Sequence, residues 1–172
     1  LKIIMGLLAP TSGTVEAFGK PCGAEADFHD MRRRVGFVFQ DADDQLFCPT
    51  VAEDVAFGPL NLGKSKAQAL AIVDAVLTRL ELMHLRDRVT HKLSGGEKRL
   101  VTLATVLAMA PEVLLLDEPT NALDQANEAR LLEILQALPQ AILLVSHDPA
   151  FRAKLAPEAL DLREGRLVPV TG

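Results

Sequence analysis

The apolar residues of this chain follow two different periods, and the period changes twice along the sequence. Residues 35–39, 113–116 and 141–145 are short, almost wholly apolar runs, which is typical of strands buried on both faces of a parallel sheet. From residue 41 to 110 the apolar residues recur instead at helical spacing. This order predicts one α/β domain over residues 1–172, in which a helical subdomain (41–110) interrupts an α/β core formed by residues 1–40 and 111–172.

Several element boundaries can be placed within this framework. Ser65-Lys66-Ala67-Gln68 has the form of a capping box and precedes an apolar stripe, so a helix should begin there. Asp148-Pro149 predicts another helix start, with Asp as the N-cap residue and Pro at the first helical position. The remaining expected elements are helices over 1–8, 96–110 and 131–138, a strand over 14–18, and two short strands between 159 and 170 around Glu164-Gly165.

Composition limits the classes of function. The 172 residues are 49% hydrophobic and 24% charged, with a net charge of −5. This balance argues against nucleic acid as the main partner, because such a partner requires a basic face. Cys22 and Cys48 show neither metal-ligand spacing nor a disulfide framework. No apolar run reaches the roughly 18 residues of a membrane span, so we expect membrane association only through a partner. The chain starts at Leu1, from which we expect a truncated N-terminus.

Polar side chains follow three of the predicted buried strands directly. Gln40 ends the first strand, Asp117 and Glu118 end the second, and His147 comes just after the third. The carboxyl ends of parallel strands share one edge of the sheet, where ligands bind in open α/β folds. A pair of loop acids or a lone histidine is often structural, but four polar groups at one edge predict a binding or catalytic site.

The segment Leu93-Ser94-Gly95-Gly96-Glu97 opens the helix predicted over 96–110. Ser94 and Glu97 have the spacing of a capping box, which is the purely structural interpretation. Each glycine destabilises a helix by roughly 1 kcal/mol relative to alanine, and capping requires neither of them. Because bare backbone at a helix N-terminus lets an anion approach the N–H groups, we interpret the motif as an anion-binding site.

Together these motifs resemble those of ATP-binding-cassette (ABC) ATPases, over essentially the whole chain. Each motif alone is moderately specific, whereas five in the family's order are very specific. Residues 93–97 resemble the signature motif, 113–118 the Walker B strand, Asn121-Ala122-Leu123-Asp124 the D-loop, Gln40 the Q-loop glutamine and His147 the switch histidine. The resemblance implies an N-terminally truncated P-loop NTPase of the ABC type, with a mostly parallel sheet and an inserted helical subdomain.

The resemblance also implies roles at a head-to-tail dimer that encloses two ATP molecules. Glu118 would polarise the attacking water, and His147 would contact the γ-phosphate. Positioning and charge stabilisation supply most of phosphoryl-transfer catalysis, so all these groups have to converge. The implied roles are catalysis by Glu118 and His147, Mg²⁺ binding by Asp117 and Gln40, contact with the partner subunit's ATP by Ser94, Gly95, Gly96 and Glu97, and a dimer-interface contact by Asp124.

Residues 43–63 carry a finer resemblance, to the ATPases of energy-coupling-factor importers and most closely to the cobalt/nickel branch; Glu97-Lys98-Arg99 fits that group too. This implies a peripheral subunit at the cytoplasmic face of the membrane that drives uptake of cobalt or nickel, paired with a second ATPase subunit as homodimer or heterodimer. A transmembrane coupling subunit would contact residues 46–57. Four apolar residues there either line its groove or pack the subdomain: Leu46, Phe47, Val51 and Phe57.

One family element is absent from this sequence. The Walker A loop, G-x-x-x-x-G-K-[ST], would precede Leu1, so we expect weak or no ATP binding by this chain alone. Three alternatives remain: a vitamin importer with the same type of ATPase, a soluble ABC protein of translation or DNA repair, and an inert subunit that lends only its signature face to a partner. The soluble class commonly has two cassettes or a coiled-coil insert, which are not seen, and Glu118 and His147 argue against an inert subunit.

Overall fold

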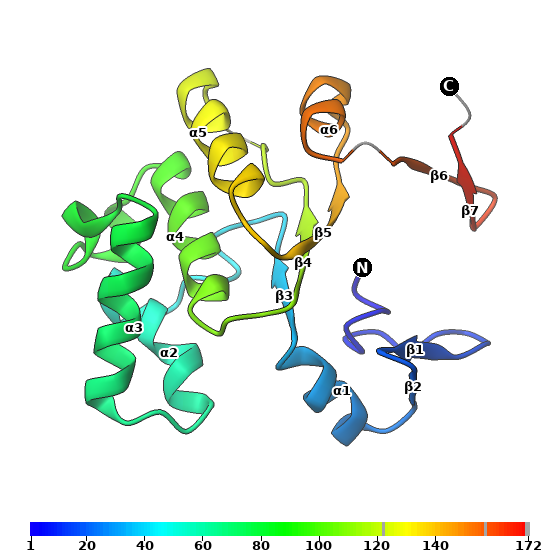
Figure 1. The fold of residues 1–172 in the computed structure, drawn as a ribbon, viewed down its shortest axis with the longest axis horizontal. Coiled ribbons are helices and arrows are strands. Elements are labelled where there is room, and N and C mark those ends of the chain that lie inside the picture. The colour runs from blue at the N-terminus through cyan, green and yellow to red at the C-terminus, as the bar shows by residue number, and fades with distance from the viewer. Residues whose placement is uncertain (122, 157, 171–172) are drawn as a thin grey trace.

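The computed structural model describes residues 1–121, 123–156 and 158–170 of the chain. Figure 1 shows a small central sheet, with α2, α3 and α4 to one side and two short ribbons, β1-β2 and β6-β7, to the other. The helices are α1 (Glu25–Arg32), α2 (Val51–Asn61), α3 (Lys66–Arg79), α4 (Gly95–Leu107), α5 (Gln125–Gln136), α6 (Pro149–Leu155) and two 3-10 helices, Met83–Leu85 and Thr90–Lys92. The strands are β1 (Val15–Ala17), β2 (Lys20–Cys22), β3 (Val35–Val38), β4 (Val113–Asp117), β5 (Ala141–Val145), β6 (Leu160–Arg163) and β7 (Arg166–Pro169).

Three parallel strands form the central sheet in the order β3-β4-β5. In register, Val38 of β3 lies opposite Leu116 of β4, and Asp117 of β4 lies opposite Val145 of β5. The two ribbons, β1-β2 and β6-β7, are antiparallel and separate from this sheet. All three parallel strands therefore point their carboxyl ends toward the same edge, as the sequence predicted.

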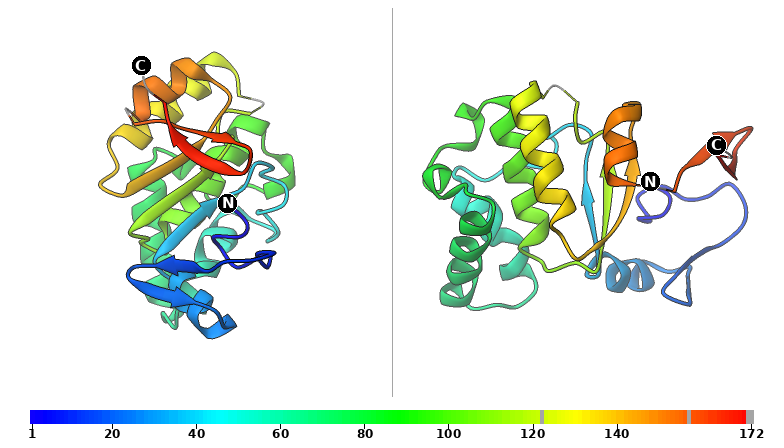
Figure 2. Two further views of the ribbon diagram at one scale, coloured as in Figure 1. Left: turned by 90° about the vertical axis from the view of Figure 1, so that its right-hand side faces the viewer. Right: turned by 45° about the horizontal axis from the view of Figure 1, so that its top comes forward.

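The two faces of the sheet pack into different cores because successive side chains alternate between faces. On one face, Leu114 and Leu116 of β4 join a large core that includes residues of α2 to α6. On the other face, Leu115 joins a smaller core with Met5 and Met31. Figure 2 shows the two views in which α5 and α6 lie over the sheet while the N-terminal ribbon lies near its other side. The helical part of the chain thus packs mainly against a single face.

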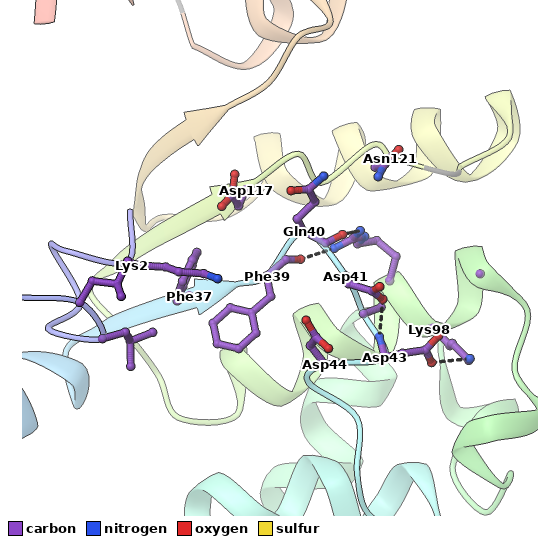
Figure 3. A pocket seen from close by; sticks show the side chains of 15 residues that line it. Lys2, Phe37, Phe39, Gln40, Asp41, Asp43, Asp44, Lys98, Asp117 and Asn121 are labelled. Carbon is purple, nitrogen blue, oxygen red and sulfur yellow. Dashed lines mark hydrogen bonds and ion pairs between the residues drawn. The ribbon is translucent and has the colours of Figure 1, made fainter. Parts of the chain in front are cut away.

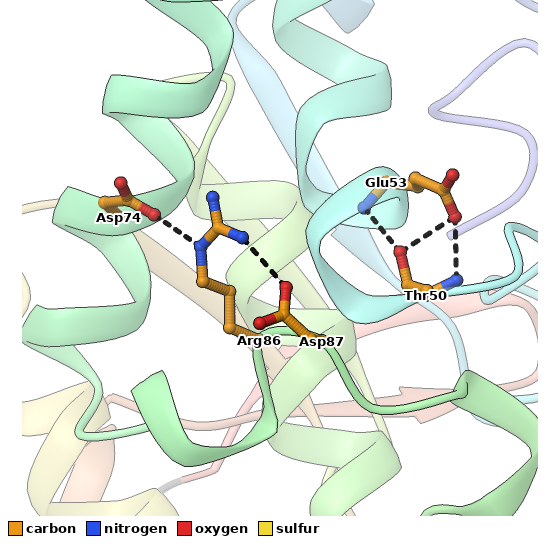
Figure 4. Close-up of polar contacts among 5 residues, drawn as sticks. All are labelled: Thr50, Glu53, Asp74, Arg86 and Asp87. Carbon is orange, nitrogen blue, oxygen red and sulfur yellow. Dashed lines mark hydrogen bonds and ion pairs between the residues drawn. The ribbon is translucent and has the colours of Figure 1, made fainter.

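Local capping explains where the helices between β3 and β4 begin. The Thr50 hydroxyl accepts a hydrogen bond from the Glu53 N–H, and the Glu53 carboxylate accepts from the Thr50 N–H at 3.0 Å (Figure 4). The same reciprocal pattern joins Ser65 and Gln68 at the start of α3, as predicted. Arg86 then donates to Asp74 of α3 at 2.7 Å and to Asp87 at 2.9 Å (Figure 4), which ties the next loop to this helix.

Most predicted elements are confirmed within a few residues. β5 matches residues 141–145, Asp148 is the N-cap of α6, and the tail forms two strands that turn at Glu164-Gly165, both with positive φ. The helix predicted over 1–8 is wrong: residues 2–6 form turns. Gly6 has a φ of 67°, a left-handed conformation that ends helical geometry, and so short a helix has too few bonds to persist by itself.

No helix in the described ranges is long and apolar enough to cross a membrane.

Candidate functional site

The carboxyl ends of β3 and β4 open into a hollow of about 810 Å³, which we call the carboxyl-edge pocket. Figure 3 shows the side chains of Gln40 and Asp117 close together at this pocket, with Asn121 beyond them. Gly95, at the start of α4, also contributes to its wall. The pocket is lined by Lys2, Leu7, Leu8, Phe37, Phe39, Gln40, Asp41, Ala42, Asp43, Asp44, Gly95, Lys98, Arg99, Asp117 and Asn121. Three of the predicted site residues, Gln40, Gly95 and Asp117, therefore line the same pocket.

Glu118 and His147 meet beside this pocket. The His147 N–H donates to Glu118 Oε2 at 3.2 Å, and His147 Nε2 lies 3.5 Å from Glu118 Oε1. The Glu118 side chain is only 16% exposed, whereas that of His147 is 97% exposed. The predicted pair is thus in contact, with the carboxylate held inside and the imidazole reaching outward.

The backbone of Glu118 is strained. Its φ is 46°, and non-glycine residues in the left-handed region cost on the order of 1–3 kcal/mol unless the surroundings enforce them. Here the Glu118 N–H donates to the Val145 carbonyl at 2.8 Å, which extends the pairing of β4 with β5 by one residue. Glu118 Oε1 is buried and forms no hydrogen bond among the described residues, although the His147 ring nitrogen lies 3.5 Å from it. A water molecule bound to that oxygen would be polarised by a fixed carboxylate.

The glycines of the signature segment have different surroundings. Ser94 is the N-cap of α4, its hydroxyl accepts from the Glu97 N–H, and the Glu97 carboxylate accepts from the Ser94 N–H at 2.7 Å. This hydrogen bond holds the pKa of Glu97 below its usual value. A Cβ on Gly96 would lie 2.5 Å from the side-chain nitrogen of Asn127, so close packing against α5 already explains this glycine. Gly95 is exposed and faces the pocket, and so it fits best the predicted approach of an anion.

Asp124 is the N-cap of α5. Its carboxylate accepts from the backbone N–H of Asn127 at 2.8 Å and from the Asn127 side-chain amide at 3.1 Å. Within one chain this is a helix cap, and the predicted dimer-interface contact of Asp124 stays a prediction. Ala122 of the same D-loop lies outside the described residues.

The donor set of the pocket fits Mg²⁺ with its nucleotide rather than a metal held by protein alone. Asp117 and Gln40 offer the hard oxygen ligands that Mg²⁺ prefers, and this ion is commonly held by one or two carboxylates together with substrate phosphates. No group of three or more His, Cys, Asp or Glu side chains in the described part of the chain could hold a metal ion. Lys2 and Gly95 line the same pocket and supply positive charge and bare backbone for an anion.

Sequence reasoning missed the residues that hold the end of β3. Arg99 of α4 donates to the carbonyls of Phe39 and Gln40 at 2.6 and 2.5 Å. Gln45 accepts from the Phe39 N–H and donates to the Phe37 carbonyl, both at 3.0 Å. The sequence carried little signal, because Arg99 directly follows the charged residues Glu97 and Lys98, and the sequence analysis used Arg99 only as part of a family likeness.

A second surface feature lies away from the pocket. Phe47 and Phe57 are 65% and 45% exposed, and their rings meet edge to face with centroids 4.7 Å apart. Val51 is fully buried and Leu46 packs against the large core. Of the four apolar residues singled out in this segment, two therefore pack the helices and two form an exposed aromatic pair.

The family described as ABC transporter matches residues 1–121. An ABC transporter ATP-binding protein of Brucella suis biovar 1 is 54% identical over 98% of this chain and 70% of its own length. The cobalt import ATP-binding protein CbiO of Rhodobacter capsulatus is 51% identical over 95% of this chain. This chain spans only 60% of the length of that second relative.

Solved structures give the same assignment. CbiO1 of Clostridium perfringens, part of the ABC transporter complex CbiONQ, superposes with a TM-score of 0.85 at 34% identity, covering 97% of this chain and 68% of that one. The ATP-binding cassette MJ0796, a dimer in a post-hydrolysis state with ADP and Pi, superposes with a TM-score of 0.84 at 26% identity, covering 99% and 79% of the two chains. The site, the parallel sheet and these likenesses agree, and the chain belongs to the ABC transporter family of ATP-binding proteins, with the fold of its P-loop ATPases.

Proposed function

We propose that this chain forms part of the ATP-hydrolysing subunit of an importer, and that its site works across a head-to-tail dimer. The observation that carries the proposal is the contact between Glu118 and His147 at the end of two adjacent parallel strands. A buried carboxylate with one free oxygen, beside an exposed imidazole, is suited to orient a water molecule toward a phosphate held from outside the chain.

Four side chains of this chain have separate roles in the proposed hydrolysis of ATP. Glu118 Oε1 accepts a proton from the attacking water or polarises it, and His147 donates a hydrogen bond to the terminal phosphate and fixes its position. Asp117, with Gln40, holds Mg²⁺, which when bound neutralises charge on the phosphates. These steps are positioning and electrostatics, which carry most of phosphoryl transfer.

The signature segment serves the partner subunit's nucleotide in this proposal. Ser94, Gly95 and Gly96 open α4 in its first turn, and the N–H groups of a first turn have no partner within the helix. The helix dipole adds a favourable field for an anion. Glu97 keeps the turn in shape through its hydrogen bonds to Ser94, and Asp124 would approach the second subunit at the same interface. Either a homodimer or a heterodimer would satisfy this geometry, and the related ATP-binding cassette MJ0796 is a dimer in its post-hydrolysis state with ADP and Pi.

For the transported substrate we propose a transition-metal ion, cobalt or nickel. The support is the likeness of residues 43–63 to the cobalt/nickel branch of energy-coupling-factor importers and the 51% identity to a cobalt import ATP-binding protein. In this proposal the metal is cargo of the membrane subunits and is not bound by this chain. A vitamin importer with the same type of ATPase is the alternative substrate class.

For the membrane partner we propose docking at residues 46–57, with Phe47 and Phe57 as the apolar contact. An exposed pair of aromatic rings is well suited to the groove-and-helix contacts that proteins use to bind one another. In this proposal residues 41–110 form a helical subdomain that sits on a transmembrane subunit at the cytoplasmic face of the membrane, while residues 1–40 and 111–172 form the α/β core.

The test is Glu118→Gln in the native full-length protein that carries this chain. Glutamine keeps the size of the side chain but cannot accept the proton, so turnover of ATP should fall at least about a hundredfold, and ATP-bound dimers should accumulate in size-exclusion chromatography. Glu133→Gln, on the exposed side of α5, is the matched control and should hydrolyse ATP normally. Near-normal turnover by Glu118→Gln would remove Glu118 from the role of base.

A further inference from the structure

Arg99 is a buried cation on α4 that is paired with no carboxylate among the described residues. It is only 4% exposed, and its hydrogen bonds go to two main-chain carbonyls, those of Phe39 and Gln40. Burial lowers the pKa of its guanidinium, which the nearby Asp41 carboxylate opposes. Taking a guanidinium out of water is costly unless its donors are satisfied. Because Arg99 is buried and bonds only main-chain carbonyls, its burial has to be explained by a role of these two hydrogen bonds.

The two carbonyls stand where the sheet ends. The pairing of β3 with β4 stops at Val38 and Leu116, so the next two carbonyls of the chain have no neighbouring strand to bond. The planar guanidinium offers parallel donors at a fixed spacing. Two of these donors in Arg99 bond the carbonyls that no strand bonds. Gln45, from within the loop, also bonds this stretch of main chain, at the Phe39 N–H and at the Phe37 carbonyl inside β3.

Arg99 also lies close to the signature segment. Ser94 is the N-cap of α4, and five residues of helix span roughly 7.5 Å. The adjacent Lys98 forms an ion pair with Asp43 of the same loop. Figure 3 shows the ion pair of Lys98 with Asp43 at the carboxyl-edge pocket, and the Gln40 side chain directed toward Asp117. Two neighbouring residues of α4 therefore hold the loop after β3 at two points. Arg99 holds its start at Phe39 and Gln40, and Lys98 holds Asp43.

We propose that Arg99 is a positioning residue that fixes the main chain of Gln40 and makes the start of α4 and the loop after β3 move as one unit. A displacement of the signature segment then shifts the Gln40 side chain relative to Asp117, and a shift at Gln40 is returned to the signature segment. Arg99 touches neither nucleotide nor metal in this role. The inference rests on the proposed function for its effect on turnover, but its structural part stands alone.

The experiment compares Arg99→Lys and Arg99→Met with Arg130→Met in the native full-length protein. Arg130 is a matched control because its guanidinium also bonds two consecutive carbonyls, of Leu80 and Glu81, at 2.8 and 3.2 Å, away from the pocket. Lysine keeps the charge but cannot bond both carbonyls in a fixed fork. Hydrogen exchange of the amides of residues 40–44 is measured without nucleotide, and kcat and KM are measured with Mg²⁺ and ATP.

We expect both Arg99 variants to speed exchange at residues 40–44 about tenfold and to lower kcat about tenfold while KM changes less than about threefold, since small misplacements in a site cost turnover more than binding. Arg130→Met should leave exchange at residues 40–44 and kcat unchanged at a similar loss of thermal stability. If Arg99→Met does not fold, Arg99→Lys decides. Unchanged exchange and kcat in Arg99→Lys, or an equal fall in kcat in Arg130→Met, would overturn the inference. Absence of ATP hydrolysis in the unmodified protein would instead count against the proposed function and leave the exchange result to judge Arg99.

Discussion

β4 and β5 lie side by side in one sheet, and each leads into residues of the proposed site, yet their surroundings differ. β4 has a strand at both edges and packs on both faces, and its central leucines are almost completely buried. β5 has β4 at one edge, and within the described ranges no strand pairs with its other edge. Leu143 and Val145 of β5 are 43% and 40% exposed. The difference shows which of the two proposed catalytic residues, Glu118 or His147, is held in place by the core.

Among the described residues, Glu118 follows the strand that is paired at both edges, and His147 follows the strand that is paired at one edge. Accordingly Glu118 is held by the Val145 carbonyl and shielded from water, while the His147 imidazole stands almost wholly in solvent. The carboxylate is preorganised and the imidazole is free to adjust. A site that closes on a nucleotide between two subunits, as we propose, would use both kinds of group.

The largest expected effect tests the packing difference itself. Leu116→Ala in β4, where the side chain is 1% exposed, should lower the free energy of unfolding by about 2–5 kcal/mol because it leaves a cavity. Leu143→Ala in β5 should cost less than about 1 kcal/mol, since little apolar area leaves water there. Denaturant unfolding of both variants measures the contrast. Equal losses would mean that β5 is as firmly packed as β4.

A middle-sized effect is expected at Asp54, a buried carboxylate of α2. Its Oδ1 accepts from the N–H groups of Phe47 and Cys48 at 3.2 and 3.0 Å. Asp54→Ala leaves both N–H groups unpaired and should cost about 1–3 kcal/mol of unfolding free energy. Asp54→Asn keeps the acceptor and is the control, with an expected change at neutral pH within about 1 kcal/mol.

The charge of Asp54 gives the same pair of variants a pH signature. Burial raises the pKa of Asp54 above its ordinary value of 3.8, so the folded protein binds this proton more tightly than the unfolded chain does. The contribution of Asp54 to stability is therefore greatest below pH 3.8 and is lost as the pH rises through the folded pKa. Asp54→Asn should remove that fall from a plot of unfolding free energy against pH. A variant with the unaltered pH profile would assign the dependence to other groups.

A small effect on stability is expected at Phe47, which extends the comparison to the exposed apolar residues of the helical part. Because Phe47 is mostly in solvent, Phe47→Ala should cost only about 0.5–1.5 kcal/mol, the range of one aromatic pair. Copurification with the transmembrane subunit should nevertheless be lost, since this ring forms the proposed contact. Intact copurification would show that Phe47 and Phe57 do not serve the membrane partner.

A structural feature of this protein could be predicted from the sequence when it depends only on residues close to it along the chain. The runs at 113–116 and 141–145, the Ser65 and Asp148 caps and the turn at Glu164-Gly165 depend on neighbouring residues and were predicted from them. The convergence of Gln40, Asp117, Glu118 and His147 on one edge follows from parallel strands alone. α2 could not be bounded in advance, since it contains Gly58 and Pro59, which weaken a helix, and its stability comes from burial instead.

Features that join distant segments could not be predicted. Nothing near Gly96 in the sequence indicates that Asn127 would pack against it, so both glycines of the signature segment were assigned to anion approach. The pairing of Arg99 with two carbonyls of the β3 end likewise requires the fold to bring α4 to that strand. In both cases the residue type was visible and its partner was not.

The left-handed backbone of Glu118 has a consequence beyond the reaction. Glycine or asparagine would occupy that conformation with less steric conflict than glutamate does. Selection for thermal stability alone would therefore favour replacing the carboxylate to which we assign the role of base, whereas selection for turnover would keep it. In a selection for heat-resistant variants of this protein, position 118 is therefore where we expect a gain in thermal stability to be accompanied by a loss of activity.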